Sequence, residues 1–455
     1  MSRESDADQP GGAHGASAAS GTDGVGGPGP GPGPAAGAAD AALPGALPAD
    51  LRAELIAFRR DLHRHPEPGN QEYRTTAALK ARLELAGLAP RVLNTGTGLI
   101  CDIGTGSTVG TGSTVGTGSA DRTTASTAPR PMLALRADID ALPIPDTKVD
   151  CDYRSTVPGM AHACGHDVHT TVVLGAGLVL ARLHRAGRLP HPVRLIFQPA
   201  EEVLPGGAPD AIESGALEGV GRIIAVHCDP KVDAGRIGLR TGPITSACDR
   251  LEVSLDGPGG HTARPHLTTD LVTAAARVAS DVPALLGRRV DARAGLAVTW
   301  GRIEAGHACN VIPQHAELSG TVRCLDLDAW RAAPDLVHAA IAEVADLHRA
   351  KSVINYVRGV PPVVNDGAMT ELLRDAMTAR RGPYAIEDTE QSLGGEDFSW
   401  YLEQVPGAMA RLGVRTPGDS PRGDLHRGDF DPDEASVEVG VELFTAAALL
   451  DGRRL

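Results

Sequence analysis

Short unbroken apolar runs, separated by segments with helical periodicity, constrain the fold of this 455-residue chain more than any other feature. Such runs are typical of strands buried on both faces of an α/β sheet, because a half-exposed strand would alternate apolar and polar residues. They occur at residues 98–103, 132–137, 193–197 and 222–226. A long apolar helix is predicted over residues 168–183, and two amphipathic helices are predicted before residue 87. We therefore expect an α/β domain with a mixed central sheet.

The pattern of predicted elements changes after Gly242. The order there is strand, helix, two strands, helix and strand, which is the split βαβ arrangement of a compact ferredoxin-like α+β domain. Beyond Pro361 the chain is predicted to return to helices and a glycine-rich loop, and to end in a helix over residues 434–450. We therefore predict a main α/β domain over residues 49–243 and 359–455. A smaller domain, residues 244–358, interrupts it.

Two segments have too little apolar content to form a packed structure. Residues 1–48 are rich in Gly, Ala and Pro and are predicted to be a disordered tail. Residues 104–130 repeat Gly-Thr-Gly-Ser-Thr-Val and are predicted to be a flexible insertion between two strands. No Gly-Lys-Ser/Thr follows this repeat, which argues against a phosphate-binding loop.

Composition excludes several classes of partner. A formal charge of −14 and an aromatic content of 3% argue against nucleic-acid binding, which requires a basic surface and stacking platforms. No apolar run approaches the ~20 residues that cross a bilayer, and the N-terminus lacks the features of a signal peptide. The seven cysteines are scattered and make a poor disulfide framework, which is typical of a reducing compartment. We therefore expect a cytoplasmic protein with no membrane and no nucleic-acid partner.

The densest group of chemically active residues is Met160-Ala-His-Ala-Cys-Gly-His-Asp-Val-His169. Cysteine thiolate and neutral imidazole both bind borderline cations such as zinc, so Cys164 and His166 are candidate metal ligands. Gly165 would let them project from a tight loop before the helix, while Asp167 and His169 would orient them through hydrogen bonds. Two alternatives remain at this point: histidines with a structural role, and a Cys–His nucleophile pair.

An acidic pair follows the apolar run at residues 193–197. Active-site loops of α/β sheets lie at such strand ends, so Glu201 and Glu202 are candidates for a proton acceptor and a metal ligand. Adjacent carboxylates also repel, which favours neutralisation of one of them by a cation or a proton. Together with the Cys/His group, this pair favours metal-assisted hydrolysis.

Isolated polar residues mark three other strand ends or loops. His227 ends the apolar run at residues 222–226, and His426 lies in the loop 423–430. Either is a candidate ligand or a structural histidine. Asp138 and Asp140 follow the run at residues 132–137. They are candidates for metal ligands, for groups that orient the ligands, or for ion-pair partners of Arg136.

Five ordered motifs resemble the aminoacylase/carboxypeptidase family of dinuclear metallohydrolases, specifically its N-acyl amino acid amidohydrolase branch, which includes hippurate and auxin-conjugate hydrolases. The motifs are Leu135-Arg-Ala-Asp-Ile-Asp-Ala-Leu-Pro143, His162-Ala-Cys-Gly-His-Asp-Val-His169, Phe197-Gln-Pro-Ala-Glu-Glu202, Gly259-Gly-His-Thr-Ala-Arg-Pro-His266 and Gly394-Gly-Glu-Asp-Phe398. The resemblance covers the chain from about Leu51 to its end, without the tail and the insertion.

The resemblance implies a role for each candidate residue. Two divalent cations (zinc, manganese, cobalt or nickel) would bind to Cys164, His166, Glu202, His227 and His426, with Cys164 near both. Glu201 would be the general base. Asp140 would match the aspartate of the family's His-x-Asp motif and would be a catalytic residue together with Glu201, with Asp138 in place of the motif's histidine. His261 and Asn310 would reach the substrate, although turn geometry is an equally good explanation for both.

The resemblance also implies a function. The chain would cleave the amide bond of small-molecule N-acyl amino acids, using metal-activated water and Glu201, as a homodimer formed through the inserted domain. A metallo-dipeptidase or a desuccinylase of the same family is the nearest alternative. Two other classes remain open: a cysteine hydrolase that uses Cys164 with His166 or His169, and a non-catalytic relative that binds acyl amino acids.

Overall fold

The computed structural model describes residues 46–105, 131–418 and 423–451. All but the last three residues of the predicted tail lie outside these ranges. So do all but the first two residues of the predicted insertion, 104–130.

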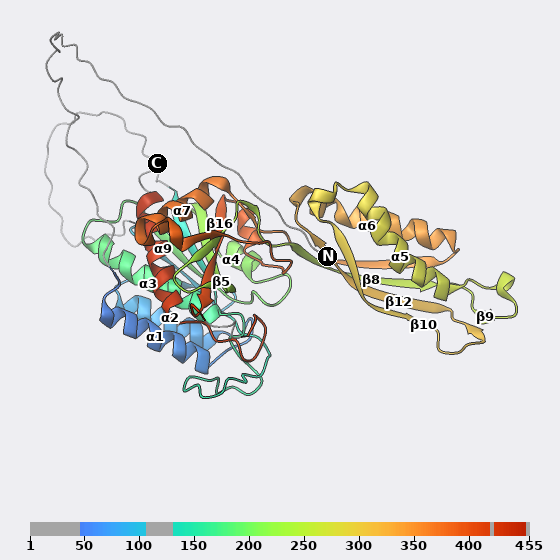
Figure 1. The fold of residues 1–455 in the computed structure, drawn as a ribbon, viewed down its shortest axis with the longest axis horizontal. Coiled ribbons are helices and arrows are strands. Elements are labelled where there is room, and N and C mark those ends of the chain that lie inside the picture. The colour runs from blue at the N-terminus through green and yellow to red at the C-terminus, as the bar shows by residue number, and fades with distance from the viewer. Residues whose placement is uncertain (1–45, 106–130, 419–422, 452–455) are drawn as a thin grey trace, which may run out of the picture. The chain divides into compact units, whose positions relative to one another are not determined.

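A mixed eight-stranded sheet is the centre of the main α/β fold, as the sequence predicted (Figure 1). Its four middle strands run parallel to one another, and the outer strands include antiparallel pairs. In pairing order the strands are β1 (Arg91–Val92), β2 (Leu99–Ile103), β4 (Val193–Gln198), β3 (Met132–Asp138), β5 (Val220–Asp233), β16 (Gly407–Arg415), β6 (Ile237–Leu239) and β15 (Ile386–Asp388).

Helices cover both faces of this sheet, which explains why its middle strands are rich in apolar residues on both faces. Leu133 and Leu135 of β3 face one hydrophobic cluster, while Met132 and Ala134 face the other. The first cluster contains α1 (Ala49–Arg64), α2 (Tyr73–Leu85), α3 (His166–Arg185), α7 (Gly367–Arg381) and α9 (Ala435–Asp451). The second contains α4 (Ala208–Glu213) and α8 (Ser399–Leu402).

Strand β16 is a correction to the sequence analysis, which expected only helices and a glycine-rich loop beyond Pro361. It lies in the middle of the sheet, parallel to β5. Arg411 interrupts its apolar run, and for this reason the segment does not have the composition of a buried strand. Its register with β5 places Met409 beside Ala225 and Arg411 beside His227. Because side chains alternate along a strand, Arg411 and His227 lie on the face that carries α4 and α8.

The segment that follows β7 (Gly242–Pro243) forms a second, four-stranded antiparallel sheet. Helices α5 and α6 pack on one face of it and share a hydrophobic cluster with its strands (Figure 1). The elements are β8 (Ala247–Asp256), α5 (Leu271–Arg289), β10 (Ala297–Ala305), β12 (His315–Cys324), α6 (Leu327–Leu347) and β13 (Lys351–Val360). This βαββαβ order is the predicted one, whereas the exact domain boundaries stay a prediction.

Short elements connect these parts. Strand β14 (Val364–Asn365) pairs with β7, and β9 (Gly260–His261) pairs with β11 (Val311–Ile312). Single 3-10 turns occur at Pro265–Leu267, Ala292–Ala294 and Pro383–Ala385.

Among the described helices, none combines the length and the apolar character that a bilayer crossing requires. All seven cysteines lie in the described residues and carry free thiols.

Candidate metal centre

The loop before α3 is shaped by Gly165. This residue has a φ of 84°, which is the left-handed region that favours glycine. A Cβ on Gly165 would also lie 2.7 Å from the Sγ of Cys228. The tight turn places Cys164 and His166 on either side of it, as the sequence predicted.

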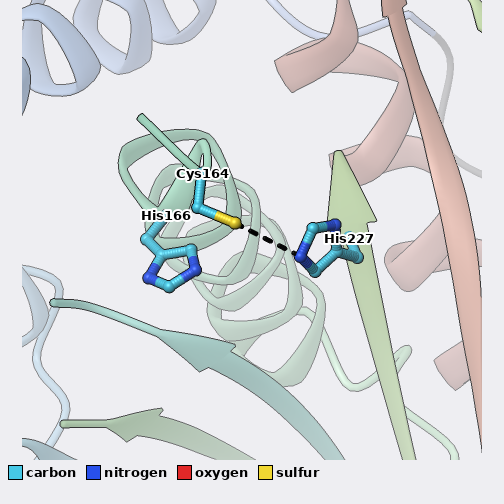
Figure 2. A group of neighbouring side chains, drawn as sticks. All are labelled: Cys164, His166 and His227. Atoms are coloured by element: carbon cyan, nitrogen blue, oxygen red, sulfur yellow. Dashed lines mark hydrogen bonds between the residues drawn. The ribbon is translucent and has the colours of Figure 1, made fainter. Parts of the chain in front are cut away.

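Cys164, His166 and His227 form a first group of potential ligands (Figure 2). One ligand atom from each lies within 4.8 Å of the other two. The Sγ of Cys164 is 3.5 Å from the Nε2 of His227, which β5 brings to the loop. Two segments 63 residues apart therefore converge on one point.

Cys164, Glu202 and His426 form a second group with the same spacing. The Nε2 of His426 lies 3.3 Å from the Oε1 of Glu202. The backbone N–H of His426 donates to the carbonyl of Ala163 at 2.8 Å, and this bond fixes the C-terminal loop against the Cys164 loop. The sulfur of Cys164 belongs to both groups.

Asp140 orients two of these residues. The Nδ1 of His166 lies 3.1 Å from the carboxylate of Asp140 and 3.0 Å from the backbone carbonyl oxygen of Asp140. The other oxygen of the carboxylate accepts from the backbone N–H of Glu202 at 3.0 Å. The Nε2 of His166 is buried without a hydrogen-bond partner. Asp140, predicted as a catalytic residue, therefore holds His166 and Glu202 by hydrogen bonds.

The buried carboxylates around His166 create an excess of negative charge. Although burial opposes its protonation, Asp138, Asp140 and Glu202 raise the pKa of His166 to about 10. A proton on this ring is what a bound cation would replace. By contrast, burial and the nearby Arg411 lower the pKa of His227, which keeps its ring neutral and able to bind a cation.

His169 is not available as a ligand, although it lies close to His166. Its Nδ1 lies 2.6 Å from Asp138, and its Nε2 accepts from the backbone N–H of Cys228 at 2.8 Å. Arg136 donates to the other oxygen of Asp138 at 2.7 Å. Both ring nitrogens are thus used in holding the loop and the strand together.

Glu201 points toward a second pair of acids, Glu396 and Asp397, with oxygens of all three within 4.8 Å of one another. Burial, followed by the charges of Glu396 and Glu202, raises the pKa of Glu201 well above its usual range. Asp397 is held by Arg136 at 2.6 Å. Sequence reasoning quoted the motif of Glu396 and Asp397 but gave these residues no role.

One cavity of about 500 Å³ is lined by seven of the residues described above: Cys164, Glu201, Glu202, His227, Glu396, Asp397 and His426. Its wall also includes Cys248, Arg323, Ser392 and Arg411, which the sequence analysis did not select. A thiol nucleophile is disfavoured here, because burial and the neighbouring Glu202 and Glu201 raise the pKa of Cys164 well above its usual range.

His261 and Asn310 lie beside each other in the inserted segment. His261 pairs with Val311, and the backbone N–H of Thr262 donates to the carbonyl of Asn310 at 3.2 Å. Both side chains are exposed, and neither is among the residues that line the 500 Å³ cavity. Asn310 does not have a positive φ, so left-handed turn geometry does not explain it.

Comparison with known proteins agrees with this geometry. Residues 134–450 match Peptidase family M20/M25/M40. An N-acetyl-L-cysteine deacetylase of Bacillus subtilis is 35% identical over 384 residues, which cover 84% of this chain and 85% of that protein. A structure of a dinuclear metal-binding peptidase of the M20 family from Bacillus subtilis superposes with a TM-score of 0.73. Its sequence is 31% identical to that of this chain, and the superposition covers 89% of this chain and 99% of that protein.

Another relative is 44% identical over 400 residues, which are 88% of this chain: a protein of Rhodococcus jostii named putative glutamate–cysteine ligase 2-3. The chain spans only 47% of the length of that relative, whose name therefore carries no activity over to this chain.

The fold, the donor groups and these matches define a metal-dependent amidohydrolase. The chain belongs to Peptidase family M20/M25/M40.

Proposed function

We propose that this chain hydrolyses the amide bond of N-acyl amino acids at a centre of two divalent cations. The observation that carries the proposal is the pair of donor groups that share the sulfur of Cys164. Cys164, His166 and His227 would hold one cation, and Cys164, Glu202 and His426 would hold the other. The name of the Bacillus subtilis deacetylase supports an N-acylated amino acid as the substrate.

The residues present fit such cations. Thiolate, imidazole and carboxylate together form a donor set that accepts zinc, manganese, cobalt or nickel. The Nε2 of His166 is buried without a partner while Asp140 fixes the other side of the ring. A ring held in this way leaves one nitrogen free for a cation.

When bound, the cations supply a water molecule with a lowered pKa and polarise the amide carbonyl. Glu201 accepts the proton of this water and returns it to the departing amine nitrogen. Its raised pKa, caused by burial and by Glu396, suits a group that must hold a proton during the reaction. Asp140 keeps His166 in position throughout.

We also propose a homodimer formed through the inserted segment. Its support is the exposure of large apolar side chains in this segment, among them Leu267, Ile303 and Val311. Sedimentation of the wild type should give the mass of two chains, and Ile303→Glu should give the mass of one. A monomeric wild type would contradict this part of the proposal.

A substrate panel tests the proposed function. The metal-loaded protein should release free amino acid from hippurate or N-acetyl-methionine. This activity should be lost after dialysis against a chelator and should return when a divalent cation is added. A dipeptidase would instead prefer unblocked dipeptides, and a desuccinylase would require a succinyl group. Activity that survives complete metal removal would contradict the proposal and favour a thiol enzyme.

A further inference from the structure

His63, in the last turn of α1, lies between two buried carboxylates. Its Nδ1 lies 2.7 Å from an oxygen of Asp167, and its Nε2 lies 3.3 Å from an oxygen of Asp146. The side chains of His63 and Asp167 are completely buried, and that of Asp146 is 2% exposed. Sequence reasoning gave His63 and Asp146 no role.

Asp167 connects this histidine to the start of α3. It follows the candidate ligand His166 in the first turn of that helix. Its carboxylate forms an ion pair with Arg59 at 2.8 Å and accepts from the backbone N–H of Val168 at 3.0 Å. Although burial opposes its ionisation, Arg59 and His63 hold the pKa of Asp167 below its usual range. The carboxylate is therefore charged and fixed at the start of the helix.

Asp146 holds the segment that follows it. The backbone N–H groups of Lys148 and Ser155 donate to its carboxylate at 3.1 and 2.9 Å. Although burial opposes its ionisation, His63 and these two N–H groups hold the pKa of Asp146 below its usual range. The imidazole therefore connects Asp146 to Asp167, two buried anions that repel each other when no group lies between them.

The loop that carries His426 is bonded to this segment. The backbone N–H of Thr147 donates to the carbonyl of Gly428 at 2.8 Å, and the Nζ of Lys148 donates to the carbonyl of Phe430 at 3.3 Å. Both donors lie within two residues of the carboxylate that contacts the imidazole. A continuous chain of contacts therefore leads from the start of α3 to the loop of His426.

We propose that His63 is a positioning residue, which sets the place of the His426 loop against the Cys164 loop by contacting Asp146 and Asp167 together. The inference rests on the proposed function, in which Cys164 and His426 hold the same cation. Metal–ligand distances are defined to about 0.2 Å, so even a small shift of one loop weakens the binding of that cation.

Removing the imidazole should affect the two cations unequally. Asp167 keeps its ion pair with Arg59 and its bond to Val168, so the start of α3 stays in place. The donor group that includes His227 should therefore hold its cation as before. The donor group that includes His426 should lose affinity, because its loop loses this buried connection to α3.

Hydrogen exchange of the metal-free protein tests the position of the loop directly. His63→Phe keeps a flat ring and removes both nitrogens. The backbone N–H groups of His426 and Thr147, which bond across the loops, should exchange about tenfold faster, while those of the four-stranded sheet should not. Unchanged exchange at His426 and Thr147 would overturn the proposal. An equal increase throughout the protein would also overturn it, because it would indicate a merely structural histidine.

A matched control lies two residues further along the chain. The Nδ1 of His65 lies 2.8 Å from the carbonyl of Asp61, and the side chain of His65 is 38% exposed. His65→Phe should leave the exchange of the His426 loop unchanged, and equal effects of the two variants would contradict the assignment. If His63→Phe does not fold, Asp146→Asn alters the other end of the same contact. It should give the same faster exchange at His426, and wild-type exchange would overturn the proposal.

A calorimetric titration with Co²⁺ separates this inference from the proposed function. The wild type should bind two ions, and His63→Phe should bind one with unchanged affinity and the other roughly 10- to 100-fold more weakly. In a His426→Ala protein, His63→Phe should cause no further loss. Equal losses at both sites, or a further loss in His426→Ala, would overturn the proposal. If the wild type binds a single ion or cleaves no N-acyl amino acid, while loop exchange still responds to His63→Phe, only the proposed function fails.

Discussion

The carboxylate of Asp138 lies 2.6 Å from the Nδ1 of His169. Because the Nε2 of His169 accepts from the backbone N–H of Cys228, the ring must carry its proton on Nδ1 and donate it to Asp138. Strand β3, helix α3 and strand β5 are thus connected through one imidazole. Although burial opposes its ionisation, His166, His169 and Arg136 hold the pKa of Asp138 well below its usual range.

Replacing this carboxylate should destabilise the fold. Asp138→Asn keeps the shape of the side chain but removes the negative charge that pairs with Arg136 and accepts the hydrogen bond of His169. Since one partner of a buried ion pair is lost, the free energy of unfolding should fall by about 3 kcal/mol. Urea unfolding of the two proteins measures the difference. Asp424→Asn, in an exposed loop, serves as the control, and equal effects of the two variants would contradict the role assigned to Asp138.

Glu201→Gln should abolish turnover while leaving the metal content unchanged. The amide cannot accept the proton of the attacking water, and kcat should fall by roughly 100- to 10,000-fold. Metal analysis of the same preparation shows whether the ions remain. Glu202→Gln is the matched comparison, because it should lose metal as well as activity. If Glu201→Gln keeps wild-type kcat, Glu201 is not the base.

Ligand variants should separate the two cation positions. Cys164 belongs to both donor groups, while His227 and His426 each belong to one. Cys164→Ser should therefore reduce the occupancy of both ions, and His227→Ala or His426→Ala should reduce that of one. Metal-to-protein ratios after gel filtration measure this. Loss of a single ion in Cys164→Ser would show that the sulfur is not shared.

Glu72 should make the protein less stable as pH rises. Its Oε1 accepts from the backbone N–H groups of Asn70 and Ala200, while its Oε2 is buried without a partner. Burial, the largest cause, raises its pKa from 4.5 to about 7. Between these two values the folded state holds more protons than the unfolded state, so stability is full below pH 4.5 and falls as pH rises through about 7.

Glu72→Gln removes this dependence. Between pH 5 and 8 the wild type should lose about 3 kcal/mol of unfolding free energy relative to the variant. Urea titrations of both proteins at each pH measure it. A constant difference between the two proteins would mean that the carboxyl titrates normally in the fold.

Gly165→Ala should lower the free energy of unfolding by more than the strain of a left-handed alanine alone. Gly87 has a φ of 78° and no neighbouring atom within 4 Å of the position that a Cβ would occupy, so Gly87→Ala reports the strain by itself, about 1 kcal/mol. A Cβ on Gly165 also meets Cys228 at 2.7 Å, and relief of this contact must move the loop that carries Cys164 and His166. The variant should therefore be less stable than Gly87→Ala and bind metal more weakly. Equal unfolding curves and metal contents would contradict this.

The sequence predicts the parts of this structure that depend on local pattern. Unbroken apolar runs predict β2, β3 and β4 because helices cover both faces of the sheet. The loop of Cys164 and His166 is predicted by the spacing of its residues around Gly165. Pairing between distant segments is a different matter. Strand β16 pairs with β5, and this pairing brings Arg411 beside His227. The two segments are about 180 residues apart, so no local sequence pattern predicts their pairing.

Roles that depend on the direction of a side chain were also beyond the sequence. His169 has the same ring as His166 and lies three residues further along one helix, yet both of its nitrogens are occupied. Glu201 and Glu202 are adjacent, yet one approaches Glu396 and the other His426. Such differences arise from the local backbone and from neighbours contributed by other strands.

The order of the strands has a consequence for synthesis of the protein on the ribosome. Strand β5 emerges long before β16, the neighbour that it needs in the middle of the sheet. In the interval the segment from β8 to β13 is translated, and it contains all the strand pairings of its own four-stranded sheet. That segment can therefore form its sheet first. Until β16 has been translated, one edge of β5 has no strand to pair with. His426 follows β16, so the donor group of Cys164, Glu202 and His426 is complete only after β16 has been translated.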